Sequence, residues 1–313
     1  MADAPADTAE KPPQEKKSFL AKLGAAIPVA LTAIATILAG MSTGALSQSM
    51  YWRSTAAQDQ AKVNDQWAFA QAKRVRSQVC YEAKRVLEGI AGYVKVTVPK
   101  KTDEPAEVTQ VGKWLGSTGE KPEAPPADMV TDAAIVGVLQ HLHHRDSEAD
   151  ILKEARKVKA EVLEKVLADA TTKALAVENA WKDERDAARK ETTTLLKALA
   201  DEKDDEKARA AAAAKVSAAR AIEDDIDDRR YRAESSMNFW VGYLYEVRVK
   251  SSTSTSDSHL RRSQNFFVAM LVAQIGSVLA SLGMNRKKGS LSAVALLAGM
   301  VAIGFGAYVF LTM

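Results

Sequence analysis

The residues best suited to chemistry in this 313-residue chain are three of its four histidines and its single cysteine. Three histidines cluster at 141, 143 and 144, and acidic residues follow at 146, 148 and 150. Positions three apart share a helix face, so His141 and His144 are weak candidate ligands for zinc or copper. No further ligand stands at a fixed spacing, which favours a charged, solvated helix end. We therefore expect no metal and no other cofactor.

Cys80 is the only cysteine, which excludes an intramolecular disulfide and any site with several cysteine ligands. Arg76 and Lys84 stand four residues to either side of it, and such neighbours favour a lowered thiol pKa. A lone cysteine on a helix is nevertheless usually inert. The chain also lacks a phosphate-binding loop, a His-Glu-x-x-His motif and a Gly-x-Ser-x-Gly motif. We predict that the protein is not an enzyme.

Composition favours helix over sheet, because alanine, lysine and glutamate are abundant and only 6% of residues are aromatic. The formal net charge of +3 is too small for a chain of this length to indicate nucleic-acid binding. Charge is unevenly distributed: apolar stretches lie near both ends, and the middle is highly charged.

Three stretches, 25–46, 266–284 and 291–313, contain no charged residue. A helix rises about 1.5 Å per residue, so about 20 residues cross a hydrocarbon core of about 30 Å. A cleaved signal peptide is the alternative for the first stretch. Signal peptides, however, have apolar runs of only about 7–15 residues behind a short basic head. The sequence thus predicts an all-α membrane protein with transmembrane helices at 25–50, 265–284 and 291–313.

Basic residues predict the orientation of these spans. The turn at 285–290 contains Arg286, Lys287 and Lys288, and the tail at 1–24, which we expect to be disordered, contains four lysines. The positive-inside rule places both in the cytoplasm, so the middle region becomes extracytoplasmic. Basic residues at 53, 261 and 262 oppose this orientation, although long loops translocate largely regardless of charge. The expected location is a bacterial inner membrane.

Small and polar residues mark the faces of the predicted spans. Small residues at spacings of three and four let helices approach closely, either within one chain or between copies. Gln274 is the most polar side chain in any span, and an interhelical hydrogen bond is its commonest role. The absence of ionisable residues from the spans argues against a pump. The predicted packing residues are Gly40, Gly44, Ala273, Gly276, Ala280, Gly299 and Gly306.

The middle region, 51–264, is predicted to be a helical bundle or coiled-coil hairpin inserted between the first and second spans. Helical spacing continues over 54–97, and a proline-rich loop follows at 98–128. No glycine or proline occurs over 138–241, and one helix of that length would reach about 150 Å. We therefore expect a short helix near 129–145, a second over 147–200, and a reversal near 201–206. The apolar seam is modest, which favours self-association.

Two further features lie near the predicted membrane surface. Residues 251–258 are mostly serine and threonine, and we interpret them as a hinge. An aromatic group at 239, 240, 243 and 245 is expected to pack against Trp67 and Phe69, with a ligand pocket as the alternative.

One motif carries a resemblance. The segment Asp65-Gln66-Trp67-Ala68-Phe69-Ala70-Gln71-Ala72-Lys73-Arg74 follows the first span, and Ala273-Gln274-Ile275 precedes the basic turn. In these features the chain resembles the bacterial membrane proteins grouped as domain of unknown function 4337, over residues 25–87 and 260–310. The middle region departs from that pattern. The resemblance implies architecture and no mechanism. The motif residues of interest are Asp65, Gln66, Trp67, Gln71 and Lys73.

These features favour a membrane-anchored helical interaction or scaffold protein. Its expected partners are the lipid bilayer, further copies of itself and an unknown protein, with no nucleic acid. Two alternatives stay open. One is an extracytoplasmic helical-bundle sensor that acts through a partner, and the other is an accessory subunit of a channel or transporter.

Overall fold

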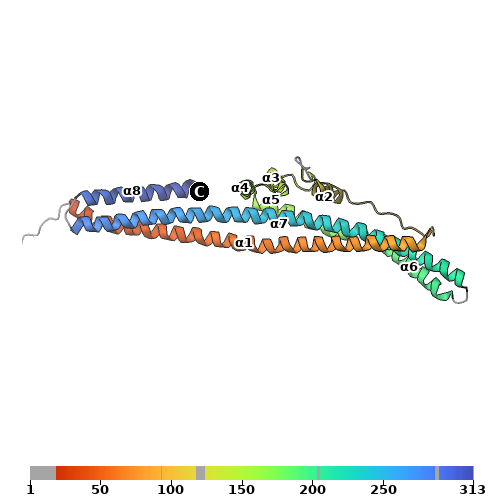
Figure 1. Cartoon of the computed structure of the whole chain (residues 1–313). Helices are drawn as coiled ribbons and strands as arrows, with labels where there is room; N and C mark the ends of the chain where they lie inside the picture. Colours follow the sequence, from red (N-terminus) through yellow and green to blue (C-terminus); the bar gives the residue numbers. More distant parts are fainter. Residues whose placement is uncertain (1–18, 93, 118–123, 203–204, 286–288, 313) are drawn as a thin grey trace, which may run out of the picture. The chain divides into compact units, whose positions relative to one another are not determined.

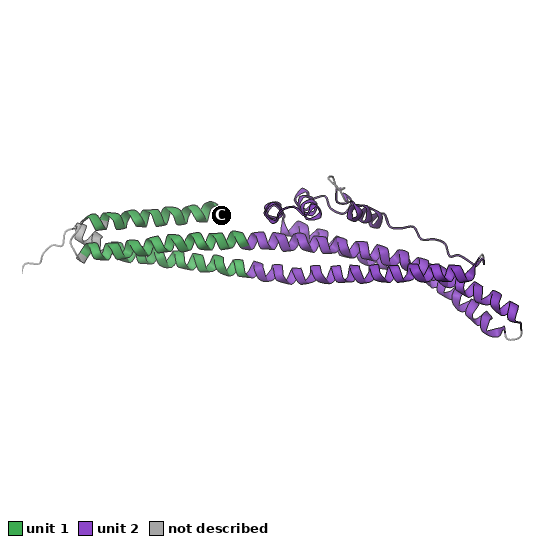
Figure 2. Ribbon diagram, in the orientation of Figure 1, with its two compact units in different colours: residues 1–50, 257–313 green, residues 51–256 purple. Residues whose placement is uncertain are grey.

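The computed structural model describes residues 19–92, 94–117, 124–202, 205–285 and 289–312. Within these ranges the regular structure is helical, without strands, which confirms the all-α prediction (Figure 1). The chain divides into two compact units: unit 1 comprises residues 1–50 and 257–313, and unit 2 comprises residues 51–256 (Figure 2). The helices of the described ranges are α1 (Phe19–Ala91), α2 (Ala106–Gly116), α3 (Ala133–His144), α4 (Glu148–Ala155), α5 (Ala160–Ala180), α6 (Lys182–Asp201), α7 (Glu206–Asn285) and α8 (Gly289–Thr312).

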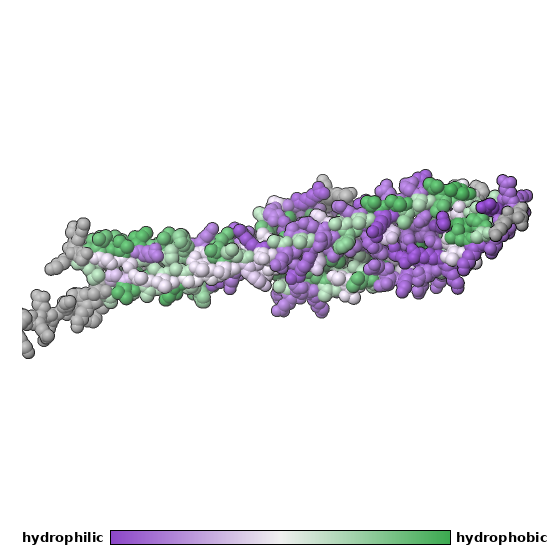
Figure 3. Space-filling view, turned by 90° about the horizontal axis from the view of Figure 1, so that it is seen from below, coloured by the Kyte–Doolittle hydropathy of each residue, from purple (hydrophilic) through white to green (hydrophobic). Residues whose placement is uncertain are grey.

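Unit 1 contains the apolar parts of three helices. Segments of α1, α7 and α8 are each long and apolar enough to cross a membrane, as predicted. Figure 3 shows hydrophobic residues gathered over these segments, whereas hydrophilic residues dominate the surface of unit 2. Leu38, Phe266 and Val309, one from each helix, are buried in a common cluster. The three apolar segments therefore pack against one another.

The limits of these helices differ from the prediction at the N-terminal end. Helix α1 begins at Phe19, so the predicted disordered tail is too long, because residues 19–24 belong to the helix. The rest of that tail lies outside the described residues. Helix α7 ends at Asn285 and α8 begins at Gly289, and the basic residues 286–288 between them also lie outside the described part.

In unit 2, α1 and α7 pack along faces whose residues recur every seven positions. Ser77 Oγ donates a hydrogen bond to Asp228 Oδ1 (2.6 Å), and Ser235 Oγ donates to the backbone carbonyl of Ala70 (2.8 Å). The partner of Ser77 on α7 is residue 228 and the partner of Ala70 is residue 235, so residue numbers rise along one helix as they fall along the other. The two helices are therefore antiparallel here. A strict seven-residue repeat keeps one face of each helix against its neighbour. The buried residues are Ala56, Val63, Ala70 and Ser77 on α1, and Asp228, Ser235, Gly242 and Val249 on α7.

Gly242 permits the closest approach of these two helices. A Cβ at this position would lie 2.6 Å from Cδ1 and Nε1 of Trp67, so the bulky indole ring would have to shift. We predict that Gly242→Ala lowers the free energy of unfolding of unit 2 by about 1–3 kcal/mol through overpacking. Chemical denaturation in detergent, followed by circular dichroism, measures the change.

Gly112 provides the matched control for this prediction. It is an exposed helical glycine, and a Cβ there would meet nothing within 4 Å. Because alanine favours helix, Gly112→Ala should stabilise by up to about 1 kcal/mol. Equal effects of the two substitutions would contradict the close approach at Gly242.

The core of unit 2 is built around three fully buried tryptophans. Trp114, Trp181 and Trp240 are each at most 1% exposed and come from α2, the α5–α6 junction and α7. Apolar side chains of α3, α4 and α5 complete the cluster. The most deeply buried of these are Ile135, Val138, Leu139, Ala155 and Leu163.

The loop predicted over 98–128 is partly wrong, because it contains the helix α2. Pro105 immediately precedes this helix, where its missing N–H is tolerated. Val108, Val111 and Trp114 recur every three residues and are buried in the core. Burial of this face stabilises a helix despite the surrounding prolines. The loop is predicted because prolines are numerous in this stretch. Residues 118–123 lie outside the described part.

The helix predicted over 147–200 is also wrong, because this stretch contains three helices, α4, α5 and α6. Trp181 separates α5 from α6 with φ −101° and ψ 9°, and its side chain is 1% exposed. Residues 156–159 separate α4 from α5. Neither break contains glycine or proline. The break between α5 and α6 thus coincides with the buried Trp181, and no helix-breaking residue accounts for it. The helix expected near 129–145 is α3, which begins after the N-cap Asp132.

The hinge predicted over 251–258 is wrong, since α7 runs without interruption from Glu206 to Asn285. Ser252, Ser254 and Ser256 are buried. Ser254 Oγ accepts a hydrogen bond from Arg156 Nε (3.0 Å) and donates to the backbone carbonyl of Leu152 (3.3 Å). Small hydroxylated residues here allow α4 to pack closely. The reversal expected near 201–206 falls between the end of α6 at Asp201 and the start of α7, and residues 203–204 lie outside the described part.

Candidate functional sites

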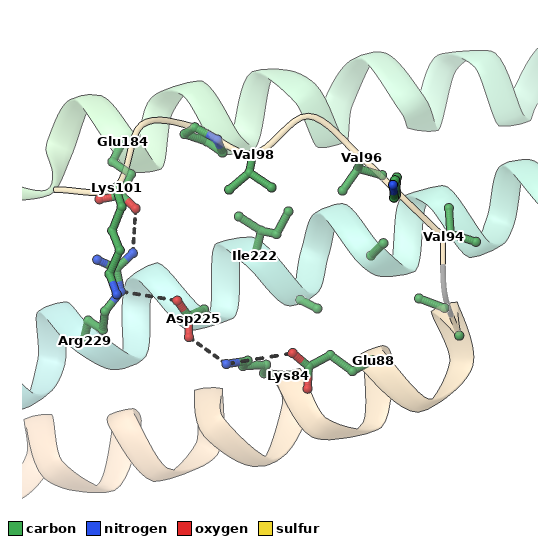
Figure 4. A pocket seen from close by; sticks show the side chains of 16 residues that line it. Lys84, Glu88, Val94, Val96, Val98, Lys101, Glu184, Ile222, Asp225 and Arg229 are labelled. Carbon is green, nitrogen blue, oxygen red and sulfur yellow. Dashed lines mark hydrogen bonds and ion pairs between the residues drawn. The ribbon is translucent and has the colours of Figure 1, made fainter.

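A cleft of about 600 Å³ opens in unit 2 between α1, α6, α7 and the extended segment that follows α1 (Figure 4). Gly92, at φ +62°, ends α1 in the left-handed region, where glycine has no steric penalty. The extended segment lays Val94, Val96 and Val98 along the cleft, and Figure 4 shows Val98 and Ile222 of α7 pointing toward each other. One wall of the cleft is therefore apolar.

A chain of alternating charges forms the opposite part of the cleft. Lys84 Nζ donates to Asp225 Oδ1 (2.7 Å) and lies 3.8 Å from Glu88 Oε1. Arg229 joins Asp225 (3.3 Å, Nε to Oδ2) to Glu184 (2.5 Å, Nη2 to Oε1). These bonds connect α1, α7 and α6. Asp225 and Glu184 are hydrogen-bonded in this network, and Glu88 lies within ion-pair distance of Lys84.

The backbone of the extended segment completes this network. Thr102 N donates to Glu184 Oε2 (2.8 Å), and Arg229 Nη1 donates to the carbonyl of Thr102 (3.4 Å). Thr102 thus contacts both members of one ion pair. These bonds hold the end of the valine-rich segment against α6 and α7.

The network shifts the pKa values of its members. Burial acts to raise the pKa of Glu184, but hydrogen bonds from Arg229 and Thr102 outweigh it and lower that pKa. Burial likewise opposes the lowering of the Asp225 pKa, which hydrogen bonds and charge from Lys84 and Arg229 bring about. The hydrogen bond to Asp225 raises the pKa of Lys84. All three shifts favour the charged forms.

These shifts predict acid sensitivity of unit 2. A carboxyl whose pKa is lower in the folded state stabilises the fold above its unfolded pKa of about 4.3, and this contribution is lost as pH falls through the folded value. Glu184→Gln should therefore reduce the loss of stability on acidification below about pH 5. Urea denaturation at a series of pH values measures the slope. Glu161→Gln, at an exposed position of α5, should leave the slope unchanged; equal slopes for all three proteins would contradict the prediction.

Two lysines in the cleft are not part of the network. Lys95 and Lys101 line it, both are exposed, and neither forms an ion pair with a described residue. The lining therefore contains four cationic side chains and three carboxylates, and the carboxylates are all engaged. The cleft retains a positive charge beside its apolar wall.

In unit 1, the predicted small residues lie in two different environments. A Cβ at Gly299 would lie 2.6 Å from Leu31 Cδ2, and one at Gly306 would lie 2.9 Å from Leu38 Cδ2. Gly276 faces Leu31 and Ala298, and Ala273 and Ala280 are buried in neighbouring clusters. These five positions lie where α1, α7 and α8 meet.

Gly40 and Gly44 lie elsewhere on α1. Both are exposed, and a Cβ at either would meet nothing within 4 Å. Thr32 and Thr36 precede them at intervals of four residues and are also exposed. These four residues form a stripe of small and hydroxylated side chains on the exposed surface of α1 in unit 1.

Gln274 of α7 lies beside this stripe. It lines a hollow of about 460 Å³ together with Thr32, Thr36 and Ser277. Ser277 Oγ lies 3.0 Å from Thr32 Oγ1 and donates to the carbonyl of Pro28 (3.1 Å). The Gln274 side chain is exposed, and its amide has no hydrogen-bond partner among the described residues.

The histidine cluster does not converge on one point. His141 Nδ1 lies 2.7 Å from Asp146 Oδ2, whereas His143 stacks on Trp114 with ring centroids 4.9 Å apart and donates from Nε2 to the carbonyl of Ser117 (2.9 Å). His144 is exposed. Within the described ranges, no group of three or more His, Cys, Asp or Glu side chains is placed to hold a metal ion.

The expectation of a lowered pKa for Cys80 is wrong. Burial, followed by the charges of Asp224, Asp227 and Asp228 on α7, raises the pKa of this thiol. The sequence places two cations near Cys80 on its own helix, but the fold brings an acidic stretch of another helix against it. A raised pKa and partial burial make the thiol less reactive.

Three motif residues, Gln66, Trp67 and Lys73, face α7. Trp67 covers Gly242, the Gln66 Cβ lies close to the same glycine, and Lys73 pairs with the buried carboxylate of Glu234. Asp65 and Gln71 are exposed. Part of the motif therefore serves the helix contact within unit 2.

The aromatic group is centred on a residue that the sequence analysis missed. Trp114 meets Trp240 and Tyr243 edge to face, with ring centroids 5.3 and 5.0 Å apart. Trp67 lies 6.4 Å from Tyr243, but Phe69 is 59% exposed. The expected packing on Phe69 is therefore wrong. The three-residue spacing of Val108, Val111 and Trp114 was the signal for the missing partner.

No protein-family model, no curated protein and no solved structure matches this chain. The resemblance drawn from the motif is thus neither supported nor contradicted.

Proposed function

We propose that this protein is a membrane-anchored helical scaffold that acts by self-association rather than by catalysis. The observation that carries the proposal is the exposed stripe of Thr32, Thr36, Gly40 and Gly44 in a helix apolar enough to span a bilayer. Hydrophobicity does not drive helices together in lipid, and close backbone approach between small residues does. Thr32 contacts Ser277 of α7 at one end of this stripe, whereas the space beside Gly40 and Gly44 is open. A second copy is the proposed occupant of this surface.

Gln274 supports the same surface. An amide in hydrocarbon loses its hydrogen bonds to water, and an interhelical partner compensates for that loss. A primary amide both donates and accepts, so Gln274 side chains of two copies are complementary across a two-fold axis. The hydroxyls of Thr32 and Thr36 border the same hollow. The proposed interface therefore combines a small-residue groove with one polar pair.

We further propose that unit 1 anchors the protein in a bacterial inner membrane and that unit 2 is a coiled-coil hairpin on the extracytoplasmic side. The seven-residue repeat of buried positions on α1 and α7 is typical of coiled coils. On the outer face of α1, Val75, Val79, Val86 and Ile90 are each 62–63% exposed. Such an apolar stripe is typical of a protein interface, here with a copy of this chain or another protein. The orientation follows from the basic turn and tail.

Oxidative crosslinking in native membranes tests self-association. With Cys80 replaced by serine, Thr36→Cys supplies the only thiol on the proposed interface, and copper phenanthroline should convert most of the chain to a disulfide dimer. Ile303→Cys, on an exposed position of α8, is the matched control and should stay monomeric.

Two added substitutions make the test specific. Gly40→Leu fills the groove and should abolish the Thr36→Cys dimer, and Gln274→Leu should weaken it. Equal crosslinking at positions 36 and 303, or a dimer that is indifferent to Gly40→Leu, would overturn the proposal.

A further inference from the structure

We propose that the cleft of unit 2 binds an amphiphilic anion, namely an aliphatic chain with a carboxylate or phosphate head. The head would contact Lys95 or Lys101, which stand toward opposite ends of the valine-rich segment, and the chain would lie against the valines between them. This site is independent of the self-association surface in unit 1. It would give the extracytoplasmic unit a ligand.

The excess of positive over negative side chains in the cleft favours an anionic ligand. Glu184 and Asp225 are bound by Arg229 and Lys84, and Glu88 also lies within ion-pair distance of Lys84. Neither Lys95 nor Lys101 forms an ion pair with a carboxylate of the lining. A bound anion would neutralise this remaining charge, and a charge-assisted hydrogen bond to lysine is stronger than a neutral one.

The apolar wall of the cleft favours a ligand whose anionic head carries an aliphatic tail. Val94, Val96 and Val98 of the extended segment all line the cleft. Ala218, Ala221 and Ile222 of α7 line the same cleft. A simple inorganic anion would leave this surface wetted, whereas an aliphatic chain would cover it. The volume of about 600 Å³ falls in the usual range for small-molecule sites, about 300–1,000 Å³.

Contacts within the chain fix the two ends of the segment that forms the apolar wall of the cleft. The bonds of Thr102 to Glu184 and Arg229 fix one end of the valine-rich segment, and the left-handed Gly92 redirects the chain at the other. A preformed site avoids the cost of ordering its walls on binding. The charged network therefore has a positioning role, and the two lysines have the recognition role.

Calorimetric titration of the full chain in lipid nanodiscs tests the proposal, with empty nanodiscs subtracted to remove partitioning into lipid. Four probes share one chain length: octanoate, octyl phosphate, octanol and octyltrimethylammonium. Saturable binding of octanoate or octyl phosphate is the expected result, and the tighter of the two identifies the head group. Saturable binding of neither anion, or equal binding of octanol, would overturn the proposal.

Variants locate the site. Lys95→Gln combined with Lys101→Gln should weaken anion binding at least about tenfold, because the charge-assisted contact to the head group is lost at either end of the segment. Val96→Ser should weaken it through the apolar wall. Lys153→Gln combined with Lys197→Gln removes the same charge from exposed positions elsewhere in unit 2 and should leave binding unchanged. All these side chains are partly or fully exposed, so circular dichroism should show unaltered helix content. Equal affinities of the two double variants would contradict the site.

Discussion

Replacing Trp240 with alanine should lower the free energy of unfolding of unit 2 by about 3–5 kcal/mol, the largest effect expected of any single core substitution here. Trp240 is 0% exposed and meets Trp114 edge to face. It extends from α7 into a core to which α2, α3 and α5 also contribute. Its removal leaves a large cavity among elements that are held mainly by this cluster.

Urea denaturation of the detergent-solubilised chain, followed by far-ultraviolet circular dichroism, measures this loss. Leu175→Ala is the control, since Leu175 is 58% exposed on α5 and its truncation should cost less than about 1 kcal/mol. A stability of Trp240→Ala equal to that of the control would show that α7 does not anchor the core.

The second large effect concerns a buried charge. Glu234 of α7 has a side chain only 4% exposed, and Lys73 of α1 binds it directly. Lys73→Met should cost about 3 kcal/mol, because it leaves this carboxylate poorly compensated away from water. Arg230 Nε lies 3.5 Å from Glu234 Oε1 and compensates only part of the loss.

The double variant makes this prediction specific. Lys73→Met combined with Glu234→Leu replaces the pair by apolar side chains of similar size and should regain most of the lost stability. Arg85→Met removes an exposed cation 3.9 Å from Glu82 and should cost less than about 1 kcal/mol. If the double variant is no more stable than Lys73→Met, burial of the unpaired Glu234 carboxylate is not the cause of the lost stability.

The apolar helices could be predicted because span length depends only on local composition. Tertiary contacts decided the features that the sequence analysis missed. Pattern alone would predict a loop at α2, where burial of Trp114 stabilises a helix among prolines. Likewise no glycine or proline marks Trp181 as a helix break, and the break coincides with a side chain buried in the core.

The charged cleft could not be found from sequence for a related reason. Its ion pairs join residues far apart in the chain, such as Lys84 with Asp225 and Glu184 with Arg229. Cys80 illustrates the same limit, since the acidic residues that raise its pKa belong to another helix. Gln274 and the glycines of the spans could be identified as candidates. Which of them face inward and which face outward depends on helix rotation, which the sequence alone does not determine.

Labelling of single cysteines with a membrane-impermeant maleimide tests the anchored, outward-facing arrangement most directly. With Cys80 replaced by serine, Lys197→Cys places an exposed thiol in unit 2, and Lys287→Cys places one among the basic residues 286–288. In intact spheroplasts, the account predicts rapid labelling at 197 and labelling at 287 only after permeabilisation. Protection of position 197 until the membrane is opened, or equal labelling of both positions in intact spheroplasts, would contradict it.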